Sequence, residues 1–233
     1  MATITVSREC GSGGGLVARR LARALGYHLV DKEFMRSVLG QYGLVQFEEV
    51  YDAGPGLRAR LVPRRPEITR MLNKLVAALA RHGDTVILGR GASAVLRGYA
   101  DVLNVRIQAP FPFRVRRVAE ARGLADPRDA EAYVVDQDQR RAAFVEFSYA
   151  VDWENVHTFD LVLDTGKLPL DLVVALLTEA AGAVRQAGPG ARLAARQLED
   201  DPVLAAAVAD ALQCRTSHAS RPEETATAGR SEP

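Results

Sequence analysis

The feature that most constrains this chain is a run of glycines close to its N-terminus. A short apolar run at 4–6 is followed by Gly11 and by three consecutive glycines at 13–15, and then by an amphipathic segment at 16–25. A strand, a glycine loop and a helix in this order present backbone N–H groups and a helix N-terminus to an anion. The loop is therefore predicted to bind phosphate groups through Gly11, Ser12, Gly13, Gly14 and Gly15, although 7–16 contains no lysine.

Composition limits the classes of protein to which the chain can belong. Its 233 residues are 48% hydrophobic and 25% charged, which is typical of one ordinary globular α/β domain. A net charge of +1 gives no general electrostatic reason to bind nucleic acid. No apolar run approaches the roughly 20 residues that span a bilayer, and no basic, apolar leader precedes the first strand. We expect a cytoplasmic protein with neither a nucleic-acid nor a membrane partner.

The cysteines and histidines of this chain do not have the spacing of a disulfide framework or a metal site. The two cysteines, Cys10 and Cys214, lie far apart in the chain and do not suggest a disulfide framework. Cys10 is interpreted as a small loop residue. The four histidines have no ligand spacing, and no zinc or calcium motif is present. The sequence therefore predicts no metal site made by the protein's own side chains.

Hydrophobic periodicity predicts alternating strands and helices. Strands are expected at 3–6, 27–30, 85–88, 102–107 and 159–163, and helices at 16–25, 32–39, 67–82, 112–122, 127–144 and 170–185. Short strands that are apolar on both faces and are joined by helices indicate an α/β fold with a parallel sheet of about five strands, covered on both sides. Such sheets bind ligands at the carboxyl ends of their strands.

The domain organisation follows from changes in composition. Residues 1–186 are predicted to form one domain, and 187–213 a Gly/Pro linker with an alanine-rich helix at 191–212. That helix would pack on the domain or on a second copy of the chain, which would make a homodimer. The Ser-, Thr-, Glu- and Pro-rich tail at 214–233 is expected to be disordered. The irregular segment 40–66 is either a solvated loop or a flap over substrate.

The glycine loop alone fits three interpretations. It could be a simple glycine-rich turn. Gly11-x-Gly13 with Asp31 about 20 residues later has the spacing of a dinucleotide-binding turn, but Leu16 takes the third glycine position and four residues separate the strand from Gly11. In a phosphate-binding P-loop, Gly13 would be the second glycine. Gly14 would then occupy the lysine position, and Gly15 would stand where a hydroxyl residue is usual.

Motifs elsewhere in the chain favour the P-loop. The segments SRECGSGG, LGYHLVDKE, VILGRGA and NVRIQAPFPFRVRRV are followed by a D-x-x-R motif at Asp138–Arg141 and by YAVDW and FDLVLDTG. Their order and spacing over about 3–180 resemble the cytidylate kinase-like family, a branch of the P-loop nucleoside monophosphate kinases in which a lysine-free loop is usual. The resemblance implies a P-loop NTPase fold with three α/β/α layers. It also implies nucleotide substrates, ATP with Mg²⁺, and phosphorylation of CMP or dCMP.

The resemblance also implies roles for individual residues. Phosphoryl transfer depends on positioning and on cations around the transferred group. Arg8 in the loop, and Arg141 and Arg140 on a lid-like helix, are candidates for this catalytic role. The acceptor-binding candidates are Asp31, Arg90, Asp138 and Arg70, and Asp164 and Thr165 would lie near an adenine. In cytidylate kinases an acidic residue follows the arginine that corresponds to Arg90. This chain has Gly91 at that position.

Three functions remain as hypotheses from the sequence. The first is an ATP-dependent nucleoside monophosphate kinase. The second is a regulatory protein that binds nucleotide without turnover, since the loop lacks its lysine and its hydroxyl residue. The third, less favoured, is an NAD(P)-dependent oxidoreductase built on the dinucleotide-binding spacing.

Overall fold

The computed structural model describes residues 1–41, 65–187, 192–199 and 201–219. Most of the irregular segment predicted at 40–66 therefore lies outside the described residues. The same is true of 188–191, most of the predicted linker, and of 220–233, most of the tail that was expected to be disordered.

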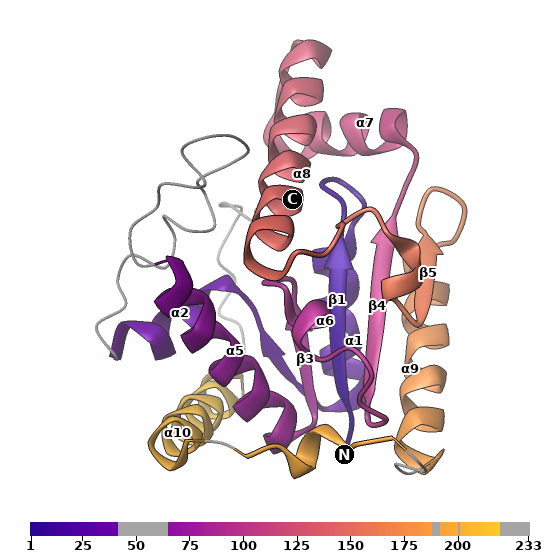
Figure 1. Ribbon diagram of the computed structural model, residues 1–233. Helices are drawn as coiled ribbons and strands as arrows, with labels where there is room; N and C mark the ends of the chain where they lie inside the picture. Colours follow the sequence, from indigo (N-terminus) through magenta and orange to yellow (C-terminus); the bar gives the residue numbers. More distant parts are fainter. Residues whose placement is uncertain (42–64, 188–191, 200, 220–233) are drawn as a thin grey trace.

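Five parallel strands form the centre of the molecule. They are β1 (Thr3–Arg8), β2 (His28–Val30), β3 (Thr85–Leu88), β4 (Val102–Gln108) and β5 (Leu161–Asp164), and their order in the sheet is β2-β3-β1-β4-β5. Every neighbouring pair is parallel. The predicted parallel sheet is thus confirmed, with β1 in the middle (Figure 1). The glycine loop follows this central strand, so it lies at the middle of the edge where ligands bind.

Helices cover both faces of the sheet, which confirms the predicted three-layer α/β/α architecture. One face packs against α1 (Gly14–Leu25) and α9 (Leu170–Ala187). The other packs against α2 (Lys32–Gln41), α5 (Arg65–His82) and the short α6 (Ala92–Val95), and α10 (Pro202–Ala219) packs on α5 and α2. Two further helices, α7 (Phe111–Arg122) and α8 (Pro127–Tyr149), stand above the carboxyl ends of the central strands (Figure 1). Short 3₁₀ turns lie at Val156–Thr158 and Ala195–Gln197.

The central strand has one apolar and one polar face. Ile4 and Val6 are fully buried against α1 and α9. Thr3, Thr5 and Ser7 point to the opposite face, as alternation along a strand requires, and they too are buried. The prediction that the strands are apolar on both faces is therefore wrong for β1. Its polar face is stabilised by hydrogen bonds, since the hydroxyl of Thr5 donates to Asn104 Oδ1 on β4 (2.7 Å).

The loop between β1 and α1 is shorter than predicted. β1 continues beyond Val6 because Ser7 pairs with Arg106 and Arg8 pairs with Ile107 on β4. Helix α1 begins at Gly14, inside the glycine run. Only 9–13 connect the two elements. Arg8 is consequently a strand residue whose backbone position is set by the sheet.

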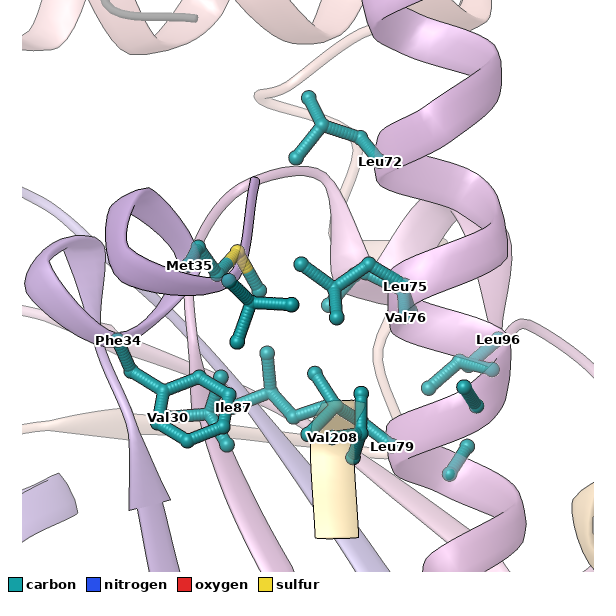
Figure 2. Close-up of a cluster of buried hydrophobic side chains, with 14 of the residues drawn as sticks. Val30, Phe34, Met35, Leu72, Leu75, Val76, Leu79, Ile87, Leu96 and Val208 are labelled. Carbon is teal, nitrogen blue, oxygen red and sulfur yellow. The ribbon is translucent and has the colours of Figure 1, made fainter. Parts of the chain in front are cut away.

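The C-terminal helix is part of the same core. It begins at Pro202, later than the predicted 191, because Pro202 is suited to a first helical position and the Asp201 carboxylate accepts a hydrogen bond from Val203 N–H (3.1 Å). Its Leu204 and Val208 are 1% exposed and pack in one cluster with residues of α2 and α5 such as Leu79 (Figure 2). The helix extends to Ala219, past the start of the tail predicted at 214.

Removal of a side chain from this contact tests whether α10 stabilises the whole domain. Leu204→Ala leaves a cavity against α5 and is expected to lower the free energy of unfolding by about 2–5 kcal/mol. Val203→Ala is the matched control, since Val203 is 68% exposed and its loss should change stability by less than about 0.5 kcal/mol. Urea denaturation of the two variants measures the difference. Equal stability of both would show that α10 does not belong to the cooperative core.

Candidate active site

The glycine loop is held in a conformation that only glycine adopts easily. Gly11 and Gly13 have φ angles of +77° and +78°, and a Cβ atom at Gly11 would lie 2.6 Å from the backbone oxygen of Arg114. Helix α1 begins next to them without a side-chain cap and without an acidic residue in its first turn. The N–H groups that a helix leaves unpaired at its start are therefore available to an anion.

Two hydroxyl groups, one in the loop and one outside it, hold this loop in shape. Ser12 is fully buried, and its hydroxyl donates to the carbonyl oxygen of Glu9 (2.9 Å). The hydroxyl of Thr165, which follows β5, donates to the carbonyl oxygen of Ser12 (2.5 Å). The sequence placed Thr165 near an adenine, whereas here its side chain anchors the loop. The backbone N–H of Ser12 also donates to the Glu9 carbonyl oxygen (3.3 Å), so both the backbone and the side chain of Ser12 hold the loop in shape.

An arginine-lined cleft opens at the carboxyl ends of β1 and β3, and its wall includes Arg8, the residue that directly precedes the glycine loop. Arg8 from β1, Arg90 from the turn after β3 and Arg141 from α8 contribute to its wall, together with Trp153. No aspartate or glutamate is among its described lining residues. Guanidinium groups bind phosphate oxygens through paired hydrogen bonds, so the chemistry of this cleft suits a phosphorylated ligand.

The turn that carries Arg90 is strained. Gly89, Arg90 and Gly91 have successive φ angles of +73°, +59° and +70°, and Arg90 is only 5% exposed. A non-glycine residue in this region costs free energy and often marks a functional site. The two glycines leave room for side chains from elsewhere, since a Cβ at Gly89 would overlap the Arg8 guanidinium and a Cβ at Gly91 would overlap the Tyr149 ring.

A buried cluster of ionic groups joins the loop to the two helices above it. Arg114 on α7 lies between two carboxylates, with its Nη1 2.6 Å from Asp138 Oδ2 and its Nε 3.2 Å from Glu9 Oε2. It also donates to the carbonyl oxygens of Ala109 (3.0 Å) and Cys10 (3.1 Å). Arg114 therefore connects α7, the loop and α8.

Cys10 lies within this cluster but is not activated by it. Burial raises the pKa of the Cys10 thiol, and the nearby Asp138 carboxylate acts in the same direction, while Arg141 and Arg114 oppose the shift. A raised pKa keeps the thiol protonated at neutral pH, and a protonated thiol is a poor nucleophile. The structural evidence agrees with the interpretation of Cys10 as a small loop residue.

The structure brings some of the residues singled out from the sequence together and leaves others apart. Arg8, Arg90 and Arg141 share the cleft. Arg140 points elsewhere, with its Nε 2.7 Å from Asp136 Oδ2. Asp31 accepts a hydrogen bond from Phe34 N–H at the start of α2 (3.0 Å), and Arg70 is exposed on α5. Asp138 belongs to the ionic cluster. Neither Arg140, Asp31, Arg70 nor Asp138 is among the residues that line the cleft.

Arg117 was assigned no role from the sequence and yet lies against the loop. Its Nη1 would be 2.5 Å from a Cβ at Gly13 and is 3.5 Å from the Gly11 carbonyl oxygen. The sequence does contain a signal for this placement. Arg114 and Arg117 are three residues apart on the helix that directly follows β4, and β4 is the neighbour of β1 in the sheet.

Metal ligands and membrane spans were also searched for in the described parts of the chain. No group of three or more His, Cys, Asp or Glu side chains is placed there to hold a metal ion. None of the helices in those parts has the length and apolar character needed to cross a membrane.

Comparison with known proteins agrees with the geometry. A crystal structure of an uncharacterized protein from Eubacterium ventriosum superposes with a TM-score of 0.60 at 22% identity, over 78% of this chain and 99% of that one, which shows the shared fold. Cytidylate kinase from Pyrobaculum neutrophilum is 32% identical over 178 residues, which is 73% of this chain and 88% of the relative. Cytidylate kinase from Methanopyrus kandleri is 27% identical over 188 residues, which is 76% and 91% of the two chains.

The family model described as the cytidylate kinase-like family matches residues 3–167. That range contains the glycine loop, the arginine-lined cleft and the ionic cluster above them. Together with the similarity to these two cytidylate kinases, the match shows that this chain belongs to the cytidylate kinase-like family of P-loop nucleoside monophosphate kinases.

Proposed function

We propose that the protein transfers the γ-phosphoryl group of ATP to CMP or dCMP, giving ADP and CDP or dCDP. The observation that carries this proposal is the cleft in which Arg8, Arg90 and Arg141 meet, with no carboxylate among its described lining residues and with Arg8 directly preceding the glycine loop. Two phosphorylated substrates bring several negative charges together, and a cationic cleft at the end of the central strand offsets their repulsion.

Each part of the site has a role in this reaction. The backbone N–H groups at the start of α1 hold the donor phosphates, and Arg90 holds the acceptor phosphate. An oxygen of the acceptor phosphate attacks the γ-phosphorus, and the bond from that phosphorus to the oxygen of ADP breaks. Arg141 and Arg8 neutralise the charge that spreads over the transferred group. These arginines take over the charge that a loop lysine would supply, since Gly14 occupies the lysine position.

Mg²⁺ fits this proposal only as an ion that the nucleotide brings. The described residues include no cluster of three acidic, histidine or cysteine side chains, and Mg²⁺ in phosphoryl-transfer sites is held mainly by substrate phosphates and water. The ion would supply charge neutralisation at the donor phosphates. The chain's own contribution is the fixed loop and the arginine-lined cleft.

The acceptor side differs from the pattern of cytidylate kinases at one position. Gly91 replaces the acid that follows the arginine in that family, and the Tyr149 ring occupies the space next to it. The chain therefore lacks one carboxylate that could select the acceptor. For this reason the acceptor is best identified with a panel of nucleoside monophosphates.

The proposal is tested with purified protein, ATP, Mg²⁺ and a panel of CMP, dCMP, UMP, AMP and GMP. We expect ADP and a pyrimidine nucleoside diphosphate to form in equal amounts, with CMP or dCMP as the preferred acceptor. Absence of any nucleoside diphosphate product from a folded protein would refute the proposal. ATP binding without turnover, measured by calorimetry, would then identify a non-catalytic nucleotide-binding protein. NADH binding without ATP binding would identify the dinucleotide alternative.

Two adjacent arginines on α8 provide a matched test of the catalytic cation. Arg141 lines the cleft and is 11% exposed, whereas Arg140 is paired with Asp136 and is 34% exposed. Arg141→Ala should lower kcat by about 10³-fold or more, because a transition-state arginine contributes about that factor. Arg140→Ala should change kcat less than threefold, since Arg140 does not line the cleft and loss of its exposed ion pair costs only about 0–1 kcal/mol of stability. Steady-state kinetics compare them, and similar losses in both variants would exclude a special role for Arg141.

A substitution in the glycine loop tests the donor site. Gly11→Ala places a Cβ against the Arg114 backbone at a φ of +77°, and this strain costs about 1–3 kcal/mol. We expect about a tenfold or larger loss of ATP affinity, measured by calorimetry. Gly182→Ala on α9 is the control, since nothing lies within 4 Å of its added Cβ. Unchanged ATP affinity in Gly11→Ala would show that donor binding does not depend on the loop.

A further inference from the structure

The Asp138 carboxylate binds three donors from three different segments. Its Oδ1 accepts from the backbone N–H of Cys10 in the glycine loop (2.7 Å) and from Arg141 Nη1 on its own helix (3.0 Å). Its Oδ2 accepts from Arg114 Nη1 on α7 (2.6 Å). The Asp138 side chain is 16% exposed. The carboxylate therefore links the phosphate loop, α7 and α8 at one point.

We propose that Asp138 is a positioning residue for the donor half of the site rather than a contact of the acceptor nucleotide. The inference deepens the proposed kinase function and rests on it. Through Asp138 the lid helix α8 is attached to the glycine loop, and Arg141 is held with one guanidinium nitrogen on the carboxylate while its side chain lines the cleft. The same group thus sets both the loop and the cation that acts on the transferred phosphate.

Two observations argue against direct contact with the acceptor. Both carboxylate oxygens already accept charge-assisted or backbone hydrogen bonds from the protein. Asp138 is also not among the residues that line the arginine cleft, although Arg141, three residues later on the same helix, is. Three of the roughly four acceptor positions of the carboxylate are occupied, and an acceptor that displaced Arg114 or Cys10 would break bonds that hold the loop. Breaking a buried ionic contact of this kind is costly.

The charge of Asp138 matters as much as its shape. Arg114 and Arg141 both point at the carboxylate, and an uncharged amide of the same size can accept on only one of its two sides. Its NH₂ group would then face either Arg114, or Arg141 and the Cys10 N–H, all of which are donors. Asp138→Asn should therefore loosen the loop or displace Arg141 while it leaves the apolar core untouched.

The test combines kinetics with hydrogen exchange on the full chain. Asp138→Asn should lower kcat by about 10²-fold, because small misplacements of reacting groups cost about that much, and should raise the KM for ATP. The KM for the acceptor should stay within twofold of the wild-type value. Exchange at the backbone amides of a 7–16 peptide, followed by mass spectrometry, should be faster. Asp136→Asn is the matched control, since Asp136 pairs with Arg140 outside the cleft, and it should leave kcat, both KM values and loop exchange unchanged.

The opposite result is a selective rise in the acceptor KM with unchanged kcat and unchanged loop exchange, which would overturn the positioning role. Asp138→Glu keeps the charge and provides a second variant if the amide variant does not fold. Backbone amides of the 7–16 peptide should exchange more slowly in Asp138→Glu than in Asp138→Asn. If wild-type protein transfers no phosphate, the proposed function fails. The positioning role is then judged by loop exchange and ATP affinity alone, and unchanged values in both variants would refute it.

Discussion

A single buried guanidinium group, that of Arg114, holds the glycine loop and the two helices above it together. Arg114 is 9% exposed and is bonded to two carboxylates and two backbone carbonyl oxygens, which belong to the glycine loop, to the end of β4 and to α8. A buried charge that loses its partners is strongly unfavourable. These segments therefore have to close together around Arg114, and the glycine loop is shaped by the helices above it as well as by the strand before it.

A second buried arginine, Arg106, connects the polar face of the sheet to the same loop. Arg106 on β4 is 1% exposed, lies 3.5 Å from Glu9 Oε1 and stacks on the Trp153 ring at 4.3 Å. Its Nη1 donates to the Trp153 carbonyl oxygen (2.5 Å). Trp153 is in turn a wall of the arginine-lined cleft. The polar residues that interrupt the hydrophobic pattern of the central strands thus contact the loop and the wall of the cleft.

Burial of apolar side chains on both faces of the sheet supplies the hydrophobic stability. One apolar cluster lies under α1 and α9, and the other lies among α2, α5 and α10 (Figure 2). Helix α10 comes from the far end of the chain and packs on α5 through Leu204 and Val208. The polar site is therefore built on a scaffold whose stability comes from burial of apolar surface on both sides, and the site can hold strained residues such as Arg90.

Much of the fold and part of the site could be predicted from the sequence. The glycines and the alternation of apolar runs with amphipathic segments are local patterns, and they correctly indicated a parallel sheet with a glycine-rich loop after the first strand. The place of Arg8 next to the glycines and the family resemblance of the segments around Arg90 and Arg141 singled out the three arginines that line the cleft. The extent of β1 and the start of α10 were not predictable from periodicity, because pairing with β4 and a Pro202 helix start decide them.

By itself, the sequence determined the α/β architecture, the glycine loop and the family, because backbone conformation and hydrophobic periodicity act over neighbouring residues. Only the tertiary structure decided which charges meet. Asp138 follows Cys10 by 128 residues in the chain, yet its carboxylate accepts that residue's N–H and two guanidinium groups. Hydrogen bonds and ion pairs between distant segments depend on side-chain direction after packing, and no spacing along the chain contains that information.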